Sequence, residues 1–332
     1  MIERSHWHPV ALAQDVAALP VSATLLDEAL VLWRDAAGQV QAWADRCPHR
    51  GARLSMGRVV TGRLECPYHG WQFAPDGACV HVPAAPAFTP PSTHVAQTHA
   101  VCEAHGLVWV CLQPGDPPSE PPWFAAEAEP GLRKLNCGPY DVATSAPRIV
   151  ENFLDMAHFG FVHTGYLGSR EHTALADYQV HDTPAGPVAT GCRVLQPRSN
   201  LHSERASEVA YRYAVLGPYT AALIKVPEPG SLAGHLASTG YQESIGLFIC
   251  PTAPEHSRIW FRLAVADFEA SAESLRGFQD TIFRQDQPVL ESQRPRRLPL
   301  DVRAERHSPA DKMSSAYRRH LVRLGITFGV LP

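Results

Sequence analysis

The chain has 332 residues, of which 45% are hydrophobic and 19% are charged, and its formal net charge is -4. This length favours two domains, and the composition is that of a globular protein with a hydrophobic core. The small negative charge, without any Lys- or Arg-rich run, argues against nucleic acid or an anionic membrane as the main partner. No apolar run approaches the roughly 20 residues that span a bilayer.

The N-terminus and the cysteines predict a cytoplasmic protein. Residues 1–10 contain no apolar segment after a basic start, so they do not resemble a signal peptide. Of the eight cysteines, only Cys47 and Cys66 have the spacing of metal ligands. The others stand alone among apolar or turn residues, as reduced, buried thiols do in the cytosol.

Residues 1 to about 115 predict short strands separated by turns. The runs 29–33 and 39–43 lie on either side of a turn at Gly38 and predict a hairpin. The mostly apolar run 106–112 predicts a buried strand.

The domain boundary is predicted in the segment 113–122. This segment contains five prolines in ten residues, which neither a helix nor a sheet accommodates. We therefore expect a first domain at 1–116 and a second domain at 123–332.

The second domain is predicted to have an α+β fold. The segment 146–163 is the clearest helix and opens with Pro147 near a first-turn position. Residues 188–266 predict strands, whereas 270–294 and 309–325 predict helices. Strands and helices that are segregated in this way are typical of an antiparallel sheet with helices packed on it.

Two Cys–His pairs form the strongest motif of the chain. Cys47 and His49 are followed, after sixteen residues, by Cys66 and His69. Such a set could hold one zinc ion, or a [2Fe–2S] cluster in which the two Cys bind one iron and the two His bind the other. Because each loop supplies one Cys and one His, whereas typical zinc fingers pair Cys with Cys, the cluster is favoured. The alternative is that the two His are ordinary polar residues of loops.

A second group of metal-capable side chains lies within the predicted helix 146–163. Asp155, His158 and His163 occur within nine residues, and two His with one carboxylate form the facial triad of iron oxygenases. Because His163 lies about 140° around an ideal helix from His158, we expect the helix to loosen or end near Gly160, for example through a π-bulge. Alone, these could be core or interface histidines. Beside the Cys–His pairs they indicate an iron site.

Both motifs resemble those of the Rieske non-haem iron oxygenases, the family of aromatic-ring-hydroxylating oxygenase α subunits. The resemblance implies an all-β Rieske domain followed by a catalytic domain of helix-grip, START-like fold. It also implies that Cys47, His49, Cys66 and His69 bind the [2Fe–2S] cluster. Trp71 resembles the aromatic residue that shields the cluster, although it could equally be a core Trp.

For the segment 152–163, the resemblance implies that His158 and His163 bind the mononuclear iron. Asp155 would then bridge an iron-ligand His and a cluster-ligand His of a neighbouring subunit, which would orient both imidazoles and connect the two centres. Asn152 belongs to the same motif and is expected to act in catalysis.

The third iron ligand is expected to be a distant acid. The segment 283–293 resembles the second signature of the family, which assigns Asp286 to the iron. Gln285 replaces the acid that usually precedes it. Asp280 and Glu291 remain alternatives, and Asp286 could instead cap a helix or face solvent.

The resemblance extends over nearly the whole chain and is closest to a branch that contains methylxanthine N-demethylase, vanillate and dicamba O-demethylases and saxitoxin hydroxylase. It implies a homotrimeric monooxygenase component that uses O2 to hydroxylate, or to remove an N- or O-methyl group from, a small aromatic or heterocyclic substrate. Electrons would come from NAD(P)H through a separate reductase or ferredoxin, since no G-x-G-x-x-G element opens a helix after a strand in this chain.

Other functions stay open from the sequence. A ring cis-dihydroxylating dioxygenase would use the same two centres, and a Rieske electron-transfer protein would need only the first domain. A zinc-binding interaction protein would leave the second motif unexplained. We expect the predicted helix and strands around 195–265 to line the substrate pocket, with the candidates Phe159, Leu201, Phe248 and Trp260.

Overall fold

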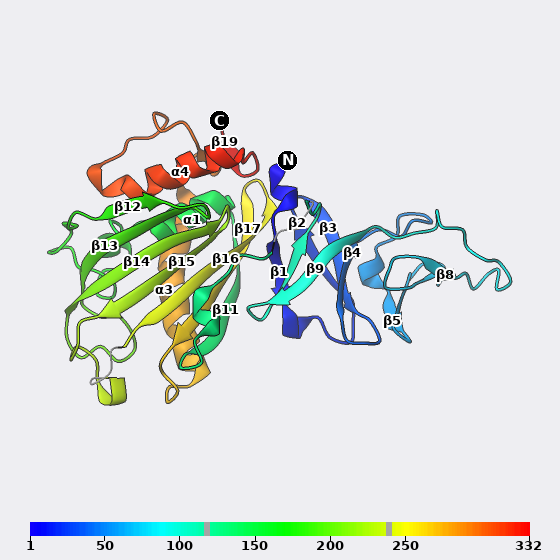
Figure 1. The fold of residues 1–332 in the computed structure, drawn as a ribbon, viewed down its shortest axis with the longest axis horizontal. Helices are drawn as coiled ribbons and strands as arrows, with labels where there is room; N and C mark the ends of the chain where they lie inside the picture. The colour runs from blue at the N-terminus through cyan, green and yellow to red at the C-terminus, as the bar shows by residue number, and fades with distance from the viewer. Residues whose placement is uncertain (116–119, 237–240) are drawn as a thin grey trace. The chain divides into compact units, whose positions relative to one another are not determined.

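The computed structural model describes residues 1–115, 120–236 and 241–332. In these residues no helix is long and apolar enough to cross a membrane. The chain divides into two compact units, which Figure 1 shows as ribbons.

The N-terminal unit comprises Arg4–Pro121, and the C-terminal unit comprises Pro122–Pro332 together with Met1–Glu3. Part of the predicted boundary segment, residues 116–119, lies outside the described residues. The sequence did not predict that the first three residues belong to the C-terminal unit.

The N-terminal unit consists of two antiparallel sheets. Its strands are β1 (His8–Leu12), β2 (Val21–Leu25), β3 (Glu28–Arg34), β4 (Val40–Ala44), β5 (Arg58–Val60), β6 (Arg63–Glu65), β7 (Gln72–Phe73), β8 (Cys79–His81), β9 (Thr98–Ala104) and β10 (Leu107–Cys111). The first sheet has the order β1-β10-β9-β4-β3-β2, and the second has the order β5-β6-β7-β8. The predicted hairpin is confirmed as β3 and β4, and the predicted buried strand is confirmed as β10.

Aromatic packing forms the core beneath the second sheet. Trp33 and Trp43 meet edge to face with ring centroids 5.0 Å apart, and Trp43 meets Phe73 in the same way at 6.4 Å. Cys47 and Cys66 belong to this buried cluster. The two predicted ligand loops therefore start from the core, which holds their cysteines in place.

The C-terminal unit is an antiparallel sheet with helices, as predicted. Its strands are β11 (Arg133–Val142), β12 (Gln179–Asp182), β13 (Pro187–Gln196), β14 (Ser207–Gly217), β15 (Thr220–Pro227), β16 (Glu243–Ala253), β17 (His256–Val265), β18 (Leu298–Pro299) and β19 (Val330–Leu331). The main sheet has the order β11-β17-β16-β15-β14-β13-β12, whereas β18 and β19 form a separate parallel pair.

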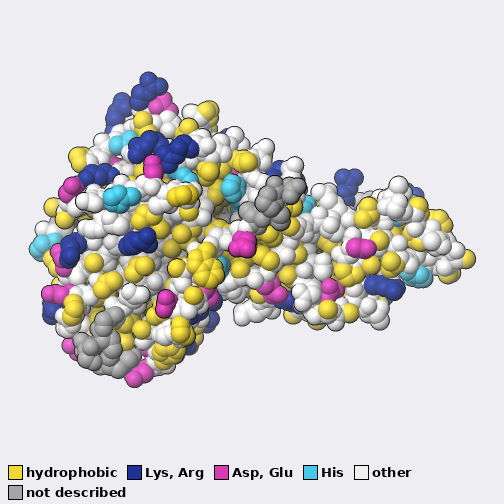
Figure 2. Space-filling model, viewed as in Figure 1, with side chains coloured by type: hydrophobic (Ala, Val, Ile, Leu, Met, Phe, Trp, Pro, Cys, Tyr) yellow, Lys and Arg dark blue, Asp and Glu magenta, His cyan; other side chains and the backbone are white. Residues whose placement is uncertain are grey.

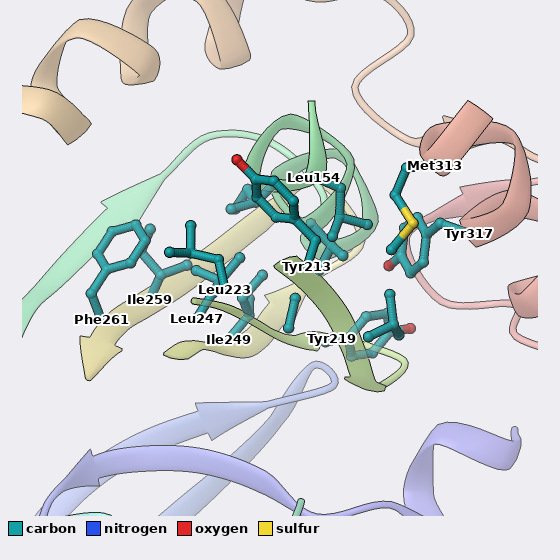
Figure 3. Packing of buried hydrophobic residues seen from close by; sticks show 14 of the residues in the cluster. Leu154, Tyr213, Tyr219, Leu223, Leu247, Ile249, Ile259, Phe261, Met313 and Tyr317 are labelled. Atoms are coloured by element: carbon teal, nitrogen blue, oxygen red, sulfur yellow. The ribbon is translucent and has the colours of Figure 1, made fainter. Parts of the chain in front are cut away.

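The helices pack against this sheet. They are α1 (Ala146–Leu154), α2 (Phe159–Val162), α3 (Ala272–Ser292) and α4 (Lys312–Leu324), and the same unit contains 3₁₀ turns at η4 (Ala125–Ala128), η5 (Gly234–Leu236) and η6 (Pro309–Asp311). The turns η2 (Ala13–Asp15) and η3 (Leu54–Met56) belong to the N-terminal unit, and η1 (Ile2–Ser5) lies where the two units divide. Helix α1 contacts β15 and β16, α3 contacts β11, and α4 contacts β12 and β13 (Figure 1). Figure 3 shows Leu223, Leu247 and Phe261 of the sheet in one cluster with Leu154 of α1 and Met313 of α4.

The predicted helices 270–294 and 309–325 are confirmed by α3 and by η6 with α4. Helix α3 begins after Ser271, whose hydroxyl accepts a hydrogen bond from the backbone N–H of Ser274, as N-cap residues do. Helix α4 ends at Gly325, whose φ of 71° lies in the left-handed region that glycine adopts without strain.

A buried charge network connects α1 with α4. The guanidinium of Arg318 donates to Glu151 with an Nε–Oε1 distance of 2.6 Å, and it also contacts Glu305. Arg148 of α1 donates to the same Glu305 at 2.6 Å. Although burial by itself raises the pKa of Glu305, the two guanidinium groups outweigh it and lower that pKa to about 2. The network thus holds α1, the helix that leads into the second motif.

We predict that Arg318→Met destabilises the protein while Arg319→Met does not. Arg318 is buried, and its loss leaves the partly buried carboxylates of Glu151 and Glu305 with fewer partners. Arg319 is exposed. Figure 2 shows that Lys and Arg side chains gather on the surface over α4. The free energy of unfolding in urea, followed by circular dichroism, should fall by about 3 kcal/mol for the first variant. Equal stability of the two variants would contradict the role of the network.

Candidate metal centres

The two Cys–His loops have the same backbone geometry. The N–H of Gly51 donates to the carbonyl of Cys47 at 2.9 Å, and the N–H of Gly70 donates to that of Cys66 at 3.1 Å. Both glycines have a positive φ, of 74° and 69°, which side chains with a Cβ rarely adopt. Each tight turn therefore returns the chain so that one Cys and one His can lie on the same side of the loop.

The cysteines of these loops are buried, whereas the histidines lie nearer the surface. Cys47 and Cys66 are 1% and 2% exposed, and the rings of His49 and His69 face each other with centroids 4.7 Å apart. Burial raises the pKa of the Cys47 thiol to about 12, although the backbone N–H groups of His49 and Arg50 point to its sulfur and favour the thiolate. A bound metal would displace the proton of the Cys47 thiol, and the same backbone N–H groups would then donate hydrogen bonds to the metal-bound sulfur.

An aromatic ring flanks the histidine side of the two loops. The ring of Trp71 stacks on His49 with a centroid distance of 4.3 Å and an interplanar angle of 5°. Trp71 thus covers one side of this site.

The second motif is built on a broken helix. Helix α1 ends at Leu154, and Asp155 adopts an extended conformation with φ of -89° and ψ of 136°. Its carboxylate accepts a hydrogen bond from the backbone N–H of Ala157 at 2.7 Å, which stabilises the turn. The short helix α2 then separates His158 from His163. This break brings both imidazoles to one point, which a continuous helix could not do.

The prediction that the helix loosens or ends near Gly160 was therefore wrong. The chain leaves the helix five residues earlier than Gly160, because the side chain of Asp155 competes with the helical hydrogen bonds. Gly160 serves a different purpose. A Cβ at Gly160 would lie 2.8 Å from the carbonyl oxygen of Ser169, so a larger residue would push this loop away.

Two imidazoles and one carboxylate converge in the C-terminal unit. The Nε2 atoms of His158 and His163 are 3.2 Å apart, and Oδ1 of Asp286 lies 3.4 Å and 3.2 Å from them. Asp286 reaches this point from α3, more than a hundred residues away in the sequence. Two neutral imidazoles and one carboxylate that leave coordination positions open are the donor set of non-haem Fe(II) oxygenases, so the residues fit this metal.

Neighbouring polar groups orient each of the three candidate ligands. Asp155 Oδ2 lies 3.2 Å from Nδ1 of His158, and Oε1 of Gln285 lies 2.8 Å from Nδ1 of His163. Asn152 donates to Oδ1 of Asp286 at 3.4 Å. Such partners fix the ring orientation of metal-binding imidazoles. This function of Gln285 was not predicted from the sequence, where its only signal was its place beside Asp286.

The three groups also shift each other's pKa values. Burial by itself lowers the pKa of His158, but its hydrogen bonds to Asp155 and Asp286 outweigh burial and raise it to about 9. Burial raises the pKa of Asp286, but the two imidazoles lower it to about 2. Without metal, the site therefore holds a proton on His158 beside an ionised Asp286.

The alternative acids lie elsewhere. Asp280 accepts a hydrogen bond from the hydroxyl of Tyr140, and Glu291 accepts hydrogen bonds from the backbone N–H of Ala143 and the side chain of Gln287. Neither carboxylate belongs to the group of converging ligand atoms, in contrast to Asp286.

The three converging groups lie in the lining of a cavity that is open to solvent. Alternate residues of strands β14 to β17 form one wall, and α1 and α3 contribute the opposite side chains. Phe159 and Leu201 line it, as predicted. The predictions of Phe248 and Trp260 were wrong: both are buried but face away, because Leu247 and Phe261 beside them already face the cavity.

The cavity also has polar lining residues that the sequence analysis missed. Among them are Asn200, Tyr213, Lys225, Tyr241 and Glu243. The one signal in the sequence for this polar lining was Lys225, a charged residue within an otherwise apolar strand pattern. Which strand face meets the cavity is set by the register between strands.

Comparison with known proteins identifies both units. Residues 6–99 match the Rieske [2Fe-2S] domain, and residues 142–325 match the vanillate O-demethylase oxygenase C-terminal domain. The chain is 30% identical over 329 residues to methylxanthine N1-demethylase NdmA of Pseudomonas putida. The aligned region covers 96% of this chain and 88% of that protein. It is 37% identical over 164 residues to the oxygenase component of dicamba O-demethylase of Stenotrophomonas maltophilia, and this alignment covers 48% of this chain and 47% of that protein.

A solved structure shows the same fold over both units. The structure of NdmA of Pseudomonas putida CBB5 with caffeine has a TM-score of 0.83 and 29% identity, and covers 97% of this chain and 90% of that one. The match of the C-terminal unit to an oxygenase domain excludes a Rieske protein that only carries electrons. The chain therefore belongs to the Rieske non-haem iron oxygenases, as an oxygenase component that uses a [2Fe–2S] cluster, a mononuclear iron, O2 and electrons from a separate NAD(P)H-dependent reductase.

Proposed function

We propose that this oxygenase removes an N- or O-methyl group from a small aromatic or heterocyclic substrate bound in the cavity of the C-terminal unit. The observation that carries the proposal is the convergence of His158, His163 and Asp286 in the wall of that cavity. The relatives named as N- and O-demethylases support the reaction type. Hydroxylation of a methyl carbon gives a product that loses formaldehyde, which makes the reaction easy to follow.

In this proposal each centre has its own ligands. His158, His163 and Asp286 would hold the mononuclear iron, and Cys47, His49, Cys66 and His69 would hold the [2Fe–2S] cluster. When bound, the cluster supplies electrons and the mononuclear iron activates O2. Asp155 and Gln285 orient the imidazoles, Asn152 positions Asp286, and the apolar wall keeps water away from the methyl group.

We also propose that Asp155 connects the two centres of neighbouring subunits in a homotrimer. Its side chain is 27% exposed, and one of its carboxylate oxygens contacts Nδ1 of His158. The remaining lone pairs of the carboxylate could accept the N–H of the exposed His69 of a neighbouring copy. All eight cysteines are free thiols, which suits the proposed cytoplasmic location.

The first prediction of this proposal concerns the mononuclear site. Asp286→Asn should lose the mononuclear iron and keep the visible spectrum of the cluster, because removal of the charged ligand weakens a three-ligand Fe(II) site. Asp280→Asn, on the same helix, is the matched control and should retain all iron. Iron and sulfide analysis of both purified variants checks this, and retention of the mononuclear iron in Asp286→Asn would refute the assignment.

The second prediction concerns Asp155. Asp155→Asn should keep both centres and the trimer, yet lose most turnover, because the amide no longer supports electron transfer between the centres. Iron content, mass in solution and the rate of cluster oxidation in a single turnover distinguish the possible roles. Loss of iron would make Asp155 a direct ligand, and an unchanged oxidation rate would make it a surface acid.

The third prediction concerns pH. Since His158 has a pKa of about 9 without metal, a metal ion must displace its proton, so binding should strengthen as pH rises. The affinity of protein freed of its mononuclear iron for Co(II) should increase about tenfold per pH unit between about 6.5 and 8.5, and level off above the pKa. In Asp155→Asn the curve should level off at lower pH. A pH-independent affinity in the wild-type protein would contradict the protonated His158.

A further inference from the structure

The cavity wall contains a buried ion pair that the reaction itself does not require. Lys225 of β15 and Glu243 of β16 are directly opposite each other in the sheet, and their Nζ and Oε2 atoms are 3.0 Å apart. Their side chains are only 5% and 9% exposed, and both line the cavity. The neighbouring positions on the same strand face are apolar, namely Leu223 and Ile245.

Stability alone does not account for this pair. Two charges that leave water lose hydration, and an apolar pair of similar volume would often be as stable or more stable. The pair also lies in the wall of a cavity rather than in a closed core. A polar feature placed in an otherwise apolar pocket is what fixes the orientation of a ligand.

Among the residues that the structure describes, the hydrogen bonds of the pair leave one donor and one acceptor for a ligand. Oε1 of Glu243 accepts from Nδ2 of Asn200 at 3.0 Å and from the hydroxyl of Tyr241 at 2.9 Å, whereas Oε2 accepts from Lys225. Lys225 also donates to the carbonyl of Ser199. An ammonium group has three N–H donors and each carboxylate oxygen has two lone pairs, so with respect to the described residues one N–H of Lys225 and one lone pair of Oε2 remain.

Tyr213 adds an independent polar contact. Its side chain is fully buried and lines the same cavity, and among the described residues its hydroxyl has no hydrogen-bond partner. Buried hydroxyl groups are nearly always paired, so a hydroxyl in a cavity wall without a partner is suited to a ligand.

The charges in the cavity wall compensate each other. Among the described lining residues, Lys225 is the only Lys or Arg, and Glu243 neutralises it. His202 lies 2.7 Å from the carboxylate of Asp267, which is buried. Apart from the proposed mononuclear iron, an aromatic carboxylate would therefore find no cation that lacks a counter-charge, and it would be repelled by Glu243.

We propose that Lys225 and Glu243 form a specificity-determining pair that selects uncharged rings with a hydrogen-bond acceptor next to a donor, such as a cyclic amide or imide. The carbonyl would accept from Lys225, the adjacent N–H would donate to Glu243, and Tyr213 would contact a further polar atom. Ligands with a carboxylate would be rejected. This inference rests on the proposed function in one respect, that the cavity is the substrate site.

Ligand binding to the wild-type protein gives the first test. Calorimetry without O2 compares 1-methylquinazoline-2,4-dione, its 1,3-dimethyl analogue, which lacks the N–H, and 6-methoxy-2-naphthoate, an anion of similar size. The first should bind at least about tenfold more tightly than the naphthoate and about fivefold more tightly than the dimethyl analogue. Tighter binding of the naphthoate, or equal binding of all three, would overturn the proposal.

A charge change in the pair gives the second test. Glu243→Gln leaves Lys225 without its counter-charge, so the naphthoate should gain at least about tenfold in affinity while the N–H dione loses affinity. Glu208→Gln is the matched control, because Glu208 is an exposed residue of β14 that pairs with Arg193 at the surface, and it should change neither affinity. An unchanged preference in Glu243→Gln would show that the pair is only structural. Should this variant not fold, the wild-type comparison decides.

Turnover separates this proposal from the proposed function. With O2, reductase and NAD(P)H, formaldehyde should form from the N–H dione. If that ligand binds with the expected preference but none of the methylated ligands yields formaldehyde, the proposed demethylation fails while the binding preference stands. If formaldehyde forms chiefly from the naphthoate, demethylation stands and the selection by Lys225 and Glu243 is refuted.

Discussion

The C-terminal unit depends on the break in the chain at Asp155. A continuous helix would place His158 and His163 on different faces, and neither could meet Asp286 together with the other. The carboxylate of Asp155 stabilises the turn through Ala157 and at the same time holds the ring of His158. One side chain therefore sets both the backbone path and the orientation of a candidate ligand, and the cavity forms around the resulting convergence.

Two buried charge networks in this unit have different surroundings and different consequences. Arg318 joins Glu151 and Glu305 between packed helices, where its contacts hold α1 in place. Lys225 joins Glu243 in the wall of a cavity, where the described residues leave part of the hydrogen-bonding capacity of the pair unused. In both networks each buried charged group has a partner of opposite charge, because an isolated charge that leaves water loses its hydration without compensation. Only the network of Lys225 and Glu243 lies where a ligand can form further hydrogen bonds with it.

The N-terminal unit positions its candidate ligands with two short loops. The aromatic core around Trp43 fixes the two buried cysteines, and the turns at Gly51 and Gly70 return each loop toward its histidine. The result is a pair of buried thiols with a pair of more exposed imidazoles, of which that of His49 stacks on Trp71. An electron donor can reach the histidine side, while the cysteine side stays away from water.

The sequence by itself determined the family, the two kinds of domain and most candidate ligands, because Cys47, His49, Cys66 and His69 occupy short loops and His158 and His163 lie close together in the chain. Local spacing carries this information without any knowledge of the fold. The sequence could not determine where the helix breaks, since that depends on competition between the Asp155 side chain and the helical backbone. Only the tertiary structure shows that Asp286, and neither Asp280 nor Glu291 of the same helix, lies beside the two histidines, because the direction of each side chain follows from how α3 packs. It alone also brought Lys225 and Glu243 together, since the register between two strands decides which residues share a face.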